Sequence, residues 1–253
     1  MIKLKSREEI ERMRAASAVV AEVLAALRER VRPGVTTAEL DAIAEELTRR
    51  RGAIPAFKGY EVGGRVFPAS VCISINDEVV HGIPSESRVL RDGDIVGLDF
   101  GVSLDGYYGD AATTVAVGRV SAEAERLMRT TAAALQAGIE ALRPGAHVAD
   151  VSGAIQDVAE AAGYSLVREF VGHGIGRRLH EEPQVPNYRT GARGPKLKEG
   201  LVLAIEPMVN AGGAEVYVKE DGWTAATRDG SLSAHFEHSV AVTADGPYIL
   251  TLP

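Results

Sequence analysis

Two amphipathic segments open the chain, and each follows a pattern that typically starts a helix. Ser6 and Glu9 are spaced as in a capping box, and Thr36 with Glu39 repeats that spacing. Apolar residues then recur every three or four positions, which predicts one helix from about residue 7 and a second from about residue 37. An Arg-Pro-Gly sequence at 32–34 is expected to end the first helix.

Alternating and continuous apolar runs replace the helical pattern between residues 69 and 118. We predict strands at 69–75, 78–83, 93–104 and 107–118. Asp105-Gly106 lies between the last two runs, and such a pair is a strong signal for a two-residue hairpin turn. The resulting register places Asp99 opposite Ala112 and Asp110 opposite Gly101.

The same order of elements then recurs in the second part of the chain. A helix is predicted to begin near Ser121, a second Arg-Pro-Gly sequence ends it, and a shorter helix over 148–162 precedes further strands. The stretch GDIVGLD at 93–99 also resembles GLVLAIE at 200–206. We therefore predict an α+β fold and a single domain over 1–253. Its two similar helix–helix–sheet halves would span about 6–118 and 121–253, with a site where they meet.

The hairpin register predicts that Asp99 and Asp110 share one face as diagonal neighbours, about 7–8 Å apart. Gly97, Gly101 and Ala112 lie on that face and are expected to leave open space above the carboxylates. Two like charges in a partly buried pocket are costly unless a cation lies between them, which favours a metal site. Two exposed aspartates facing water are the alternative that the hairpin alone leaves open.

Two glutamates and two histidines of the second half extend this candidate site. Glu206 ends the apolar run LVLAIE and Glu237 lies in SAHFEHSVAV, where a charged side chain is rarely left unpaired. The segment VGHGIGRRLHEE at 171–182 adds His173 and His180. A helix would hold these two rings about 10.5 Å apart, so we expect at most one to bind a given ion. Four carboxylates and one histidine suit a pair of Mn, Fe, Co or Zn ions better than one structural zinc.

Composition narrows the partners and the compartment. The net charge of -7 argues against general binding to nucleic acid or anionic membranes. No apolar run approaches the roughly 18 residues of a membrane span, and the charged first residues lack the apolar region of a secretory signal. A single cysteine is typical of a reducing compartment. We expect a cytoplasmic protein with no membrane partner and no specific DNA target.

Several motifs, taken in order, resemble those of the type I methionine aminopeptidases, the short bacterial kind. The resemblance covers essentially the whole chain and implies the pita-bread fold, in which the halves surround a curved, mainly antiparallel sheet. The segments that carry it are VCISINDEVVHGIP, DGDIVGLDFGV, GYYGDAATT, FVGHGIGRRLHEEPQVPNY, AIEPMVN, EDGWT and SLSAHFEHSVAVT.

The resemblance also implies a role for each candidate residue. Five side chains would bind two divalent metal ions: Asp99, Asp110, His173, Glu206 and Glu237. Asp110 and Glu237 would bridge the ions, and Glu206 would also act as the general base. His81 and His180 would contact the substrate and the tetrahedral intermediate. The implied reaction is hydrolysis of the first peptide bond of nascent proteins that begin with methionine, favouring small second residues.

A methionine pocket is implied at Tyr60, Cys72 and Trp223. Two features depart from the family pattern: the stretch AFKGYEVGGRVFPAS at 56–70 is longer than expected, and Leu179 stands where an aromatic residue is common.

Three further expectations concern relatives and partners. An Xaa-Pro aminopeptidase or prolidase is the nearest alternative, but such enzymes usually carry an extra N-terminal domain, and only roughly 65 residues precede the first strand here. A non-catalytic binding module of the same fold is a second alternative, although it would be expected to lose ligands. The basic segment RTGARGPKLK at 189–198 is either a solvated loop or a contact with ribosomal RNA. The family precedent is monomeric.

Overall fold

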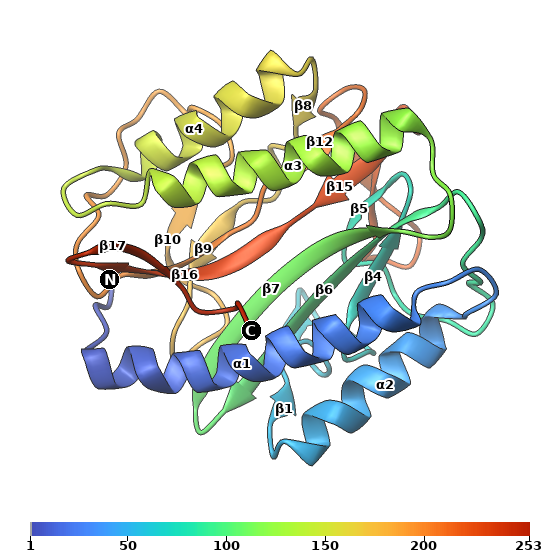
Figure 1. Cartoon of the computed structure of the whole chain (residues 1–253), viewed down its shortest axis with the longest axis horizontal. Coiled ribbons are helices and arrows are strands. Elements are labelled where there is room, and N and C mark those ends of the chain that lie inside the picture. Colours follow the sequence, from blue (N-terminus) through green and yellow to red (C-terminus); the bar gives the residue numbers. More distant parts are fainter. Residues whose placement is uncertain (1) are drawn as a thin grey trace.

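Two pairs of helices pack on one large antiparallel sheet in the computed structural model, which describes residues 2–253 (Figure 1). The first pair is α1 (Arg7–Arg30) and α2 (Thr37–Arg50), and the second is α3 (Ala122–Glu140) and α4 (Val148–Ala161). Both predicted capping boxes are present, at Ser6 and Thr36. None of the helices in residues 2–253 is long and apolar enough to cross a membrane.

The main sheet has nine strands and combines both parts of the chain. Its order is β1-β6-β7-β16-β11-β9-β10, with β4 added on β6 and β17 on β16, and all its pairs are antiparallel. The α+β class is therefore confirmed. The strands are β1 (Ile54–Pro55), β4 (Cys72–Ile75), β6 (Ile95–Leu104), β7 (Tyr107–Ala116), β9 (Gly172–Gly174), β10 (Glu181–Val185), β11 (Val202–Ile205), β16 (Glu237–Thr243) and β17 (Gly246–Ile249).

Three small sheets complete the fold. One is the hairpin of β2 (Glu61–Val62) and β3 (Arg65–Val66). The second combines β8 (Ser165–Leu166), β12 (Met208–Asn210) and β15 (Ser233–His235). The third combines β5 (Glu78–Val80), β13 (Val216–Val218) and β14 (Ala225–Thr227). The predicted strand at 78–83 thus ends earlier, and His81 follows it in a left-handed conformation with φ 61°.

The long hairpin of β6 and β7 has the predicted register. Leu104 pairs with Tyr107, Asp99 with Ala112 and Gly101 with Asp110. Asp105 and Gly106 both have positive φ, 49° and 76°, as a type I′ turn requires. The opposite face, from Val96 to Val102, is buried in the apolar core under α1 and α2.

Each part of the chain has an apolar core of its own. One cluster spans residues 16–117, and the other spans 124–242 with Ile95 added. Strands β7 and β16 join the two parts, through the pairs Glu237 with Ala112 and His238 with Ala111. In Figure 1, β7 and β16 lie side by side between the two helix pairs. The prediction of a single domain with two similar halves, at about 6–118 and 121–253, stays a prediction.

Candidate active site

The seam between β7 and β16 places the predicted metal ligands in two neighbouring rows across the sheet. In one row, Cys72 pairs with Asp99, Asp99 with Ala112, and Ala112 with Glu237. Asp110 lies two residues from Ala112, and therefore on the same face.

The second row runs from Asp110 to His173. The backbone N–H of Asp110 donates to Ser239 Oγ (3.1 Å), and Ala204 pairs with both Ser239 and His173. Strand pairing and the hydrogen bond to Ser239 therefore bring together carboxylates of the first half and ligands of the second. Glu206, directly after β11, completes the group.

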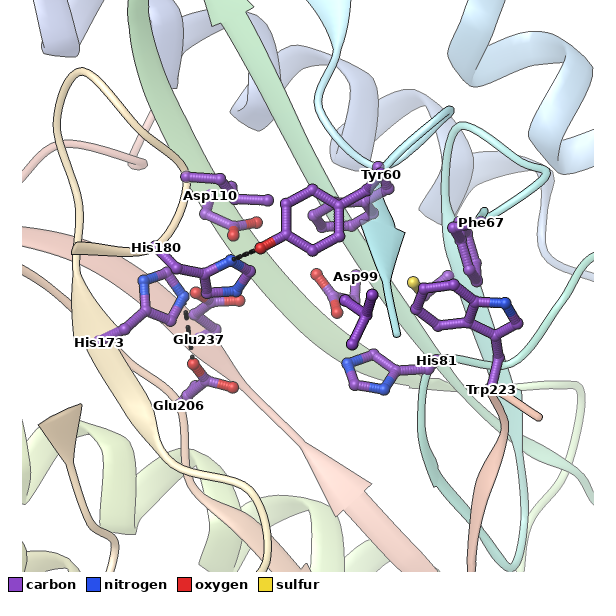
Figure 2. A pocket seen from close by; sticks show the side chains of 14 residues that line it. Tyr60, Phe67, His81, Asp99, Asp110, His173, His180, Glu206, Trp223 and Glu237 are labelled. Carbon is purple, nitrogen blue, oxygen red and sulfur yellow. Dashed lines mark hydrogen bonds and ion pairs between the residues drawn. The ribbon is translucent and has the colours of Figure 1, made fainter. Parts of the chain in front are cut away.

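The five side chains line one cavity of about 350 Å³ (Figure 2). Ligand atoms of Asp110, His173 and Glu237 all lie within 4.8 Å of one another. His173 Nε2 is 3.4 Å from Glu206 Oε1, and His235 Nε2 is 3.7 Å from Glu206 Oε2. Asp110, His173 and Glu237 are buried, so the alternative of two exposed aspartates is wrong for Asp110.

The carboxylates carry acceptor atoms that the protein does not satisfy. Asp99 Oδ1, Asp110 Oδ1 and Glu237 Oε1 are buried without a hydrogen-bond partner. Burial raises the pKa of Asp99 to about 7, and burial together with the charge of Asp99 raises the pKa of Asp110 well above its usual range. Burial of unpaired carboxylates costs free energy through lost hydration and through repulsion between like charges. A divalent cation between them reduces both costs. The site fits a metal ion.

His173 has the tautomer that metal binding requires. Its Nδ1 lies 3.0 Å from the carbonyl oxygen of Gly174, to which it donates, so Nε2 presents a lone pair to the cavity. Burial lowers the pKa of His173 to about 3, which keeps the ring neutral. The imidazole therefore offers a nitrogen ligand next to the carboxylate oxygens.

The two remaining histidines lie in the same cavity as the carboxylates. Burial lowers the pKa of His81 to about 4, so this ring is neutral at physiological pH. His180 is exposed, and its Nδ1 is 2.8 Å from the hydroxyl of Tyr60. His180 also packs on His173 with ring centroids 4.3 Å apart. The segment that joins these two residues is not helical, because the chain folds back between β9 and β10. The separation of about 10.5 Å that a helix would give therefore does not apply.

The opposite part of the cavity is apolar and largely aromatic. Tyr60, Cys72 and Trp223 line it, as the predicted pocket requires. Phe57, Phe67 and Leu179 line it as well, and sequence reasoning gave Phe57 and Phe67 no role. Figure 2 shows Phe67 and Trp223 on one side of the view and His173, Glu206 and Glu237 on the other. The sequence feature that could have indicated their place in the cavity is the presence of two large aromatic residues in a glycine-rich loop.

The face above the aspartates is less open than predicted. A Cβ at Gly101 would meet Phe57 Cε1 at 3.1 Å and Ala56 Cβ at 3.3 Å. The loop after β1 therefore covers this part of the sheet. The space left by Gly101 is filled by the pocket wall.

The long loop at 56–70 forms the hairpin β2–β3 at the cavity mouth. Val62 lines the cavity, and Arg65 donates to the carbonyl oxygen of Gly222 (3.0 Å), next to Trp223. Gly63 and Gly64 at its tip both have positive φ, which only glycine adopts without strain. The stretch that departs from the family pattern thus contains a short flap, the hairpin β2–β3, which is hydrogen-bonded to the Trp223 loop.

A cavity with clustered carboxylates and a metal-ready histidine is typical of metal-dependent hydrolases. The sequence model of metallopeptidase family M24 matches residues 11–244, and the chain belongs to this family. Enzymes of this class depend on divalent metal ions.

Individual relatives match over the full length. The methionine aminopeptidase of Clostridium perfringens is 53% identical over 252 residues, which cover 100% of this chain and 99% of the relative. Methionine aminopeptidase 1 of Bacillus subtilis is 47% identical, with 99% of each chain covered. The resemblance to methionine aminopeptidases is therefore confirmed.

Solved structures confirm the fold. The methionine aminopeptidase of Thermotoga maritima superposes with a TM-score of 0.96 at 44% identity, and all of both chains is covered. A prolidase from Pyrococcus furiosus gives a TM-score of 0.78 at 24% identity, covering 99% of this chain but 65% of that one. The second likeness shows a shared fold alone, and the match leaves about a third of that prolidase uncovered.

Proposed function

We propose that this chain removes the N-terminal methionine from proteins and peptides by metal-dependent hydrolysis of the first peptide bond. The observation that carries the proposal is the two-sided cavity, with unsatisfied carboxylates at one end and an apolar pocket at the other. Anionic groups beside a metal site attract a free α-amino group, and the apolar end suits a thioether side chain. Full-length identity of 53% to a methionine aminopeptidase supports the same activity.

Two divalent ions, from among Co, Mn, Fe and Zn, would be bound by Asp99, Asp110, His173, Glu206 and Glu237. Bound ions would supply Lewis acidity for the scissile carbonyl and lower the pKa of a water molecule in the cavity. Asp110 and Glu237 belong to opposite sides of the seam and suit a bridging role. Mixed oxygen and nitrogen ligands are compatible with each of these metals.

Glu206 is the residue we assign as general base and proton shuttle. Burial and the charges of Asp99 and Asp110 raise its pKa well above the usual range, which strengthens its affinity for a proton taken from water. Its oxygens face His173 and His235, which are both neutral.

His180 and His81 would act on the two sides of the scissile bond. If the Tyr60 hydroxyl donates to His180 Nδ1, then Nε2 carries the proton and can donate to the developing oxyanion. His81 would hydrogen-bond the scissile amide nitrogen. The side chains of Tyr60, Cys72 and Trp223, with Phe57, Phe67 and Leu179, would hold the methionine. The rings of His81 and His180 would lie close to the scissile bond, and this would favour small second residues.

The first test removes bound metal with a chelator and restores Co, Mn, Fe or Zn one at a time. Free methionine released from Met-Gly-Ser is measured, with Ala-Pro-Ser alongside. Metal-dependent release of methionine and no cleavage before proline is the expected result. Cleavage only before proline would indicate an Xaa-Pro peptidase instead. Metal binding without any cleavage would indicate a non-catalytic binding module.

Nascent chains are the proposed physiological substrates. We expect the protein to act on them in the cytoplasm, as a monomer. Arg193, Lys196 and Lys198 are exposed on the basic segment, whereas Arg189 pairs with Asp157 at 2.7 Å. Three exposed cations on one loop suit a transient contact with ribosomal RNA. Reversing the charge at Arg193 and Lys196 should weaken co-sedimentation with ribosomes without changing peptide turnover. Unchanged co-sedimentation would contradict the proposed contact with the ribosome. Light scattering would test the monomeric state.

A further inference from the structure

A buried ion pair connects the start of the chain to the loop that carries His180. Lys5 Nζ lies 2.8 Å from Glu181 Oε2, and the two side chains are only 5% and 4% exposed. Lys5 directly precedes Ser6, the N-cap of α1, and Glu181 directly follows His180. The pair therefore connects the first half of the chain with a candidate catalytic residue of the second half.

Glu181 uses its other oxygen to close the loop before it. Oε1 accepts the backbone N–H groups of Arg177 (2.9 Å) and Arg178 (3.2 Å). Burial alone would raise the pKa of Glu181, but the hydrogen bond and charge of Lys5, together with these N–H groups, lower it. The carboxylate is thus ionised at neutral pH and holds both ends of the segment 177–181.

Lys5 is fixed as firmly as its partner. Its Nζ also donates to the carbonyl oxygen of Lys3 (3.1 Å), and its backbone N–H donates to Gly200 (2.7 Å). A Cβ at Gly176 would overlap the Lys5 side chain, and a Cβ at Gly200 would overlap its backbone. Two glycines therefore leave the space that the lysine fills.

Stability alone gives a weak reason for such a pair. Taking two charges out of water costs several kcal/mol per ion, and a buried pair is often no better for stability than apolar residues of similar size. Among the other residues of the loop, Leu179 is buried in the apolar pocket, whereas Arg177, Arg178 and His180 are exposed. The His180 ring is supported from the side, by Tyr60 and His173.

We propose that Lys5 and Glu181 are positioning residues for the hydrolysis, which act by holding the loop so that His180 Nε2 faces the scissile bond. This inference rests on the proposed function. It assigns the start of the chain a role in the reaction, although Lys5 lines neither the candidate metal site nor the apolar pocket.

The test compares Lys5→Met, which keeps the length of the side chain and removes its charge, with Lys3→Met, which removes a charge from an exposed side chain two residues away. Both are measured in the wild-type background and in His180→Ala, with metal content and thermal stability recorded. We expect Lys5→Met to lower kcat roughly 10- to 100-fold with KM changed less than about threefold, because a displaced catalytic group loses its alignment. In the His180→Ala background the same substitution should change kcat less than about twofold, since residues that act as a unit are not additive.

Glu181→Gln is the second variant, for the case that Lys5→Met does not fold. It keeps an oxygen for the two N–H groups and disrupts only the ion pair, and the same loss of kcat is expected. An equal loss in both backgrounds, or an unchanged kcat, would overturn the proposal. Loss of bound metal in parallel with activity would overturn it too.

Amide hydrogen exchange gives a readout that needs no turnover. The N–H groups of Arg177 and Arg178 should exchange faster in Lys5→Met than in wild type and in Lys3→Met. Unchanged exchange would show that the pair does not hold the loop. If wild-type protein showed this exchange pattern but no peptidase activity, the proposed function would be contradicted. The conclusion that Lys5 and Glu181 hold the loop would still stand.

Discussion

The floor and the wall of the cavity are built in different ways. The floor consists of Asp99, Asp110, Glu237 and His173 on paired strands, where register fixes each side chain relative to the next, with Glu206 directly after β11. Apart from Cys72 on β4, the wall consists of residues from three separate loops, around Phe57 and Phe67, at Leu179 and at Trp223. Side chains on a sheet are positioned by backbone hydrogen bonds, whereas those on loops depend on contacts with each other. Changes in the floor should therefore affect chemistry, and changes in the wall should affect recognition.

The largest effect is expected at the floor, for Glu206→Gln. This change keeps size and removes the proton acceptor, so kcat should fall roughly 10²- to 10⁴-fold with little change in KM. Steady-state kinetics with Met-Gly-Ser at saturating metal measures both constants. A kcat within a factor of three of wild type would contradict the role of Glu206 as base.

Asp110→Asn tests the metal site itself. An amide in place of a bridging carboxylate should weaken metal binding by more than about 100-fold, since even partners outside the ligand shell are worth 10- to 100-fold. Titration calorimetry with Mn and metal analysis of the dialysed protein measure this. Asp157→Asn, far from the cavity on exposed α4, is the control and should bind metal normally.

A wall variant should produce the opposite pattern. Trp223→Ala removes apolar contact with the methionine side chain, so kcat/KM should fall roughly 10- to 100-fold through KM, with metal content unchanged. Comparison of peptides that begin with methionine and with norleucine would report on the pocket. If Trp223→Ala lost its metal, the floor and the wall would not be separable.

The metal-free floor should make stability depend on pH in a direction that can be calculated. Burial raises the pKa of Asp99 to about 7, and burial together with neighbouring carboxylates raises the pKa values of Asp110, Glu206 and Glu237 well above their usual range, whereas unfolded carboxyl groups titrate near pH 4. The folded state therefore binds more protons than the unfolded state, and stability falls as pH rises through the folded pKa values. The slope is about 1.4 kcal/mol per pH unit for each proton.

The buried histidines change the folding stability with pH in the opposite direction, and they do so at lower pH. Burial lowers the pKa of His173 to about 3 and that of His81 to about 4, so their contribution to stability rises with pH up to about 6.5 and is constant above it. Urea unfolding at pH 7 and pH 8 therefore reports mainly on the carboxylates, because the buried Cys72 thiol, whose pKa is also raised, begins to contribute only near the unfolded value of about 8.5. Metal-free protein should be less stable at pH 8, and metal-loaded protein should show a smaller slope. A metal-free protein equally stable at both values would contradict the burial argument.

The smallest effect is expected at the flap. Arg65→Met removes the hydrogen bond to Gly222 at an exposed site and should raise KM by roughly two- to fivefold without changing kcat. Progress curves with Met-Gly-Ser are sufficient to measure it. A change in kcat would mean that the flap does more than contact the substrate.

The sequence allowed the floor to be predicted in detail and the wall only in outline. The Asp-Gly turn determined the hairpin register, and the register determined which face carried Asp99 and Asp110. No comparable rule connects Phe57 or Phe67 to the cavity, because a loop has no fixed period and the hairpin β2–β3 has its own geometry. His81 shows the same limit, since its left-handed conformation ends the strand earlier than the apolar run suggests.

The seam between β7 and β16 determines when the site can form during synthesis. Asp110 can adopt its hairpin as soon as β6 and β7 have been made, but the seam pairs residue 112 with residue 237. At synthesis rates of about 5–20 residues per second, the carboxylates of the first half wait roughly 6–25 s for Glu237. Throughout that interval β7 presents an unpaired edge, and the aspartates face solvent. A copy of this protein still being translated therefore lacks part of the proposed ligand set, and a metal ion could join its halves only once β16 has been made.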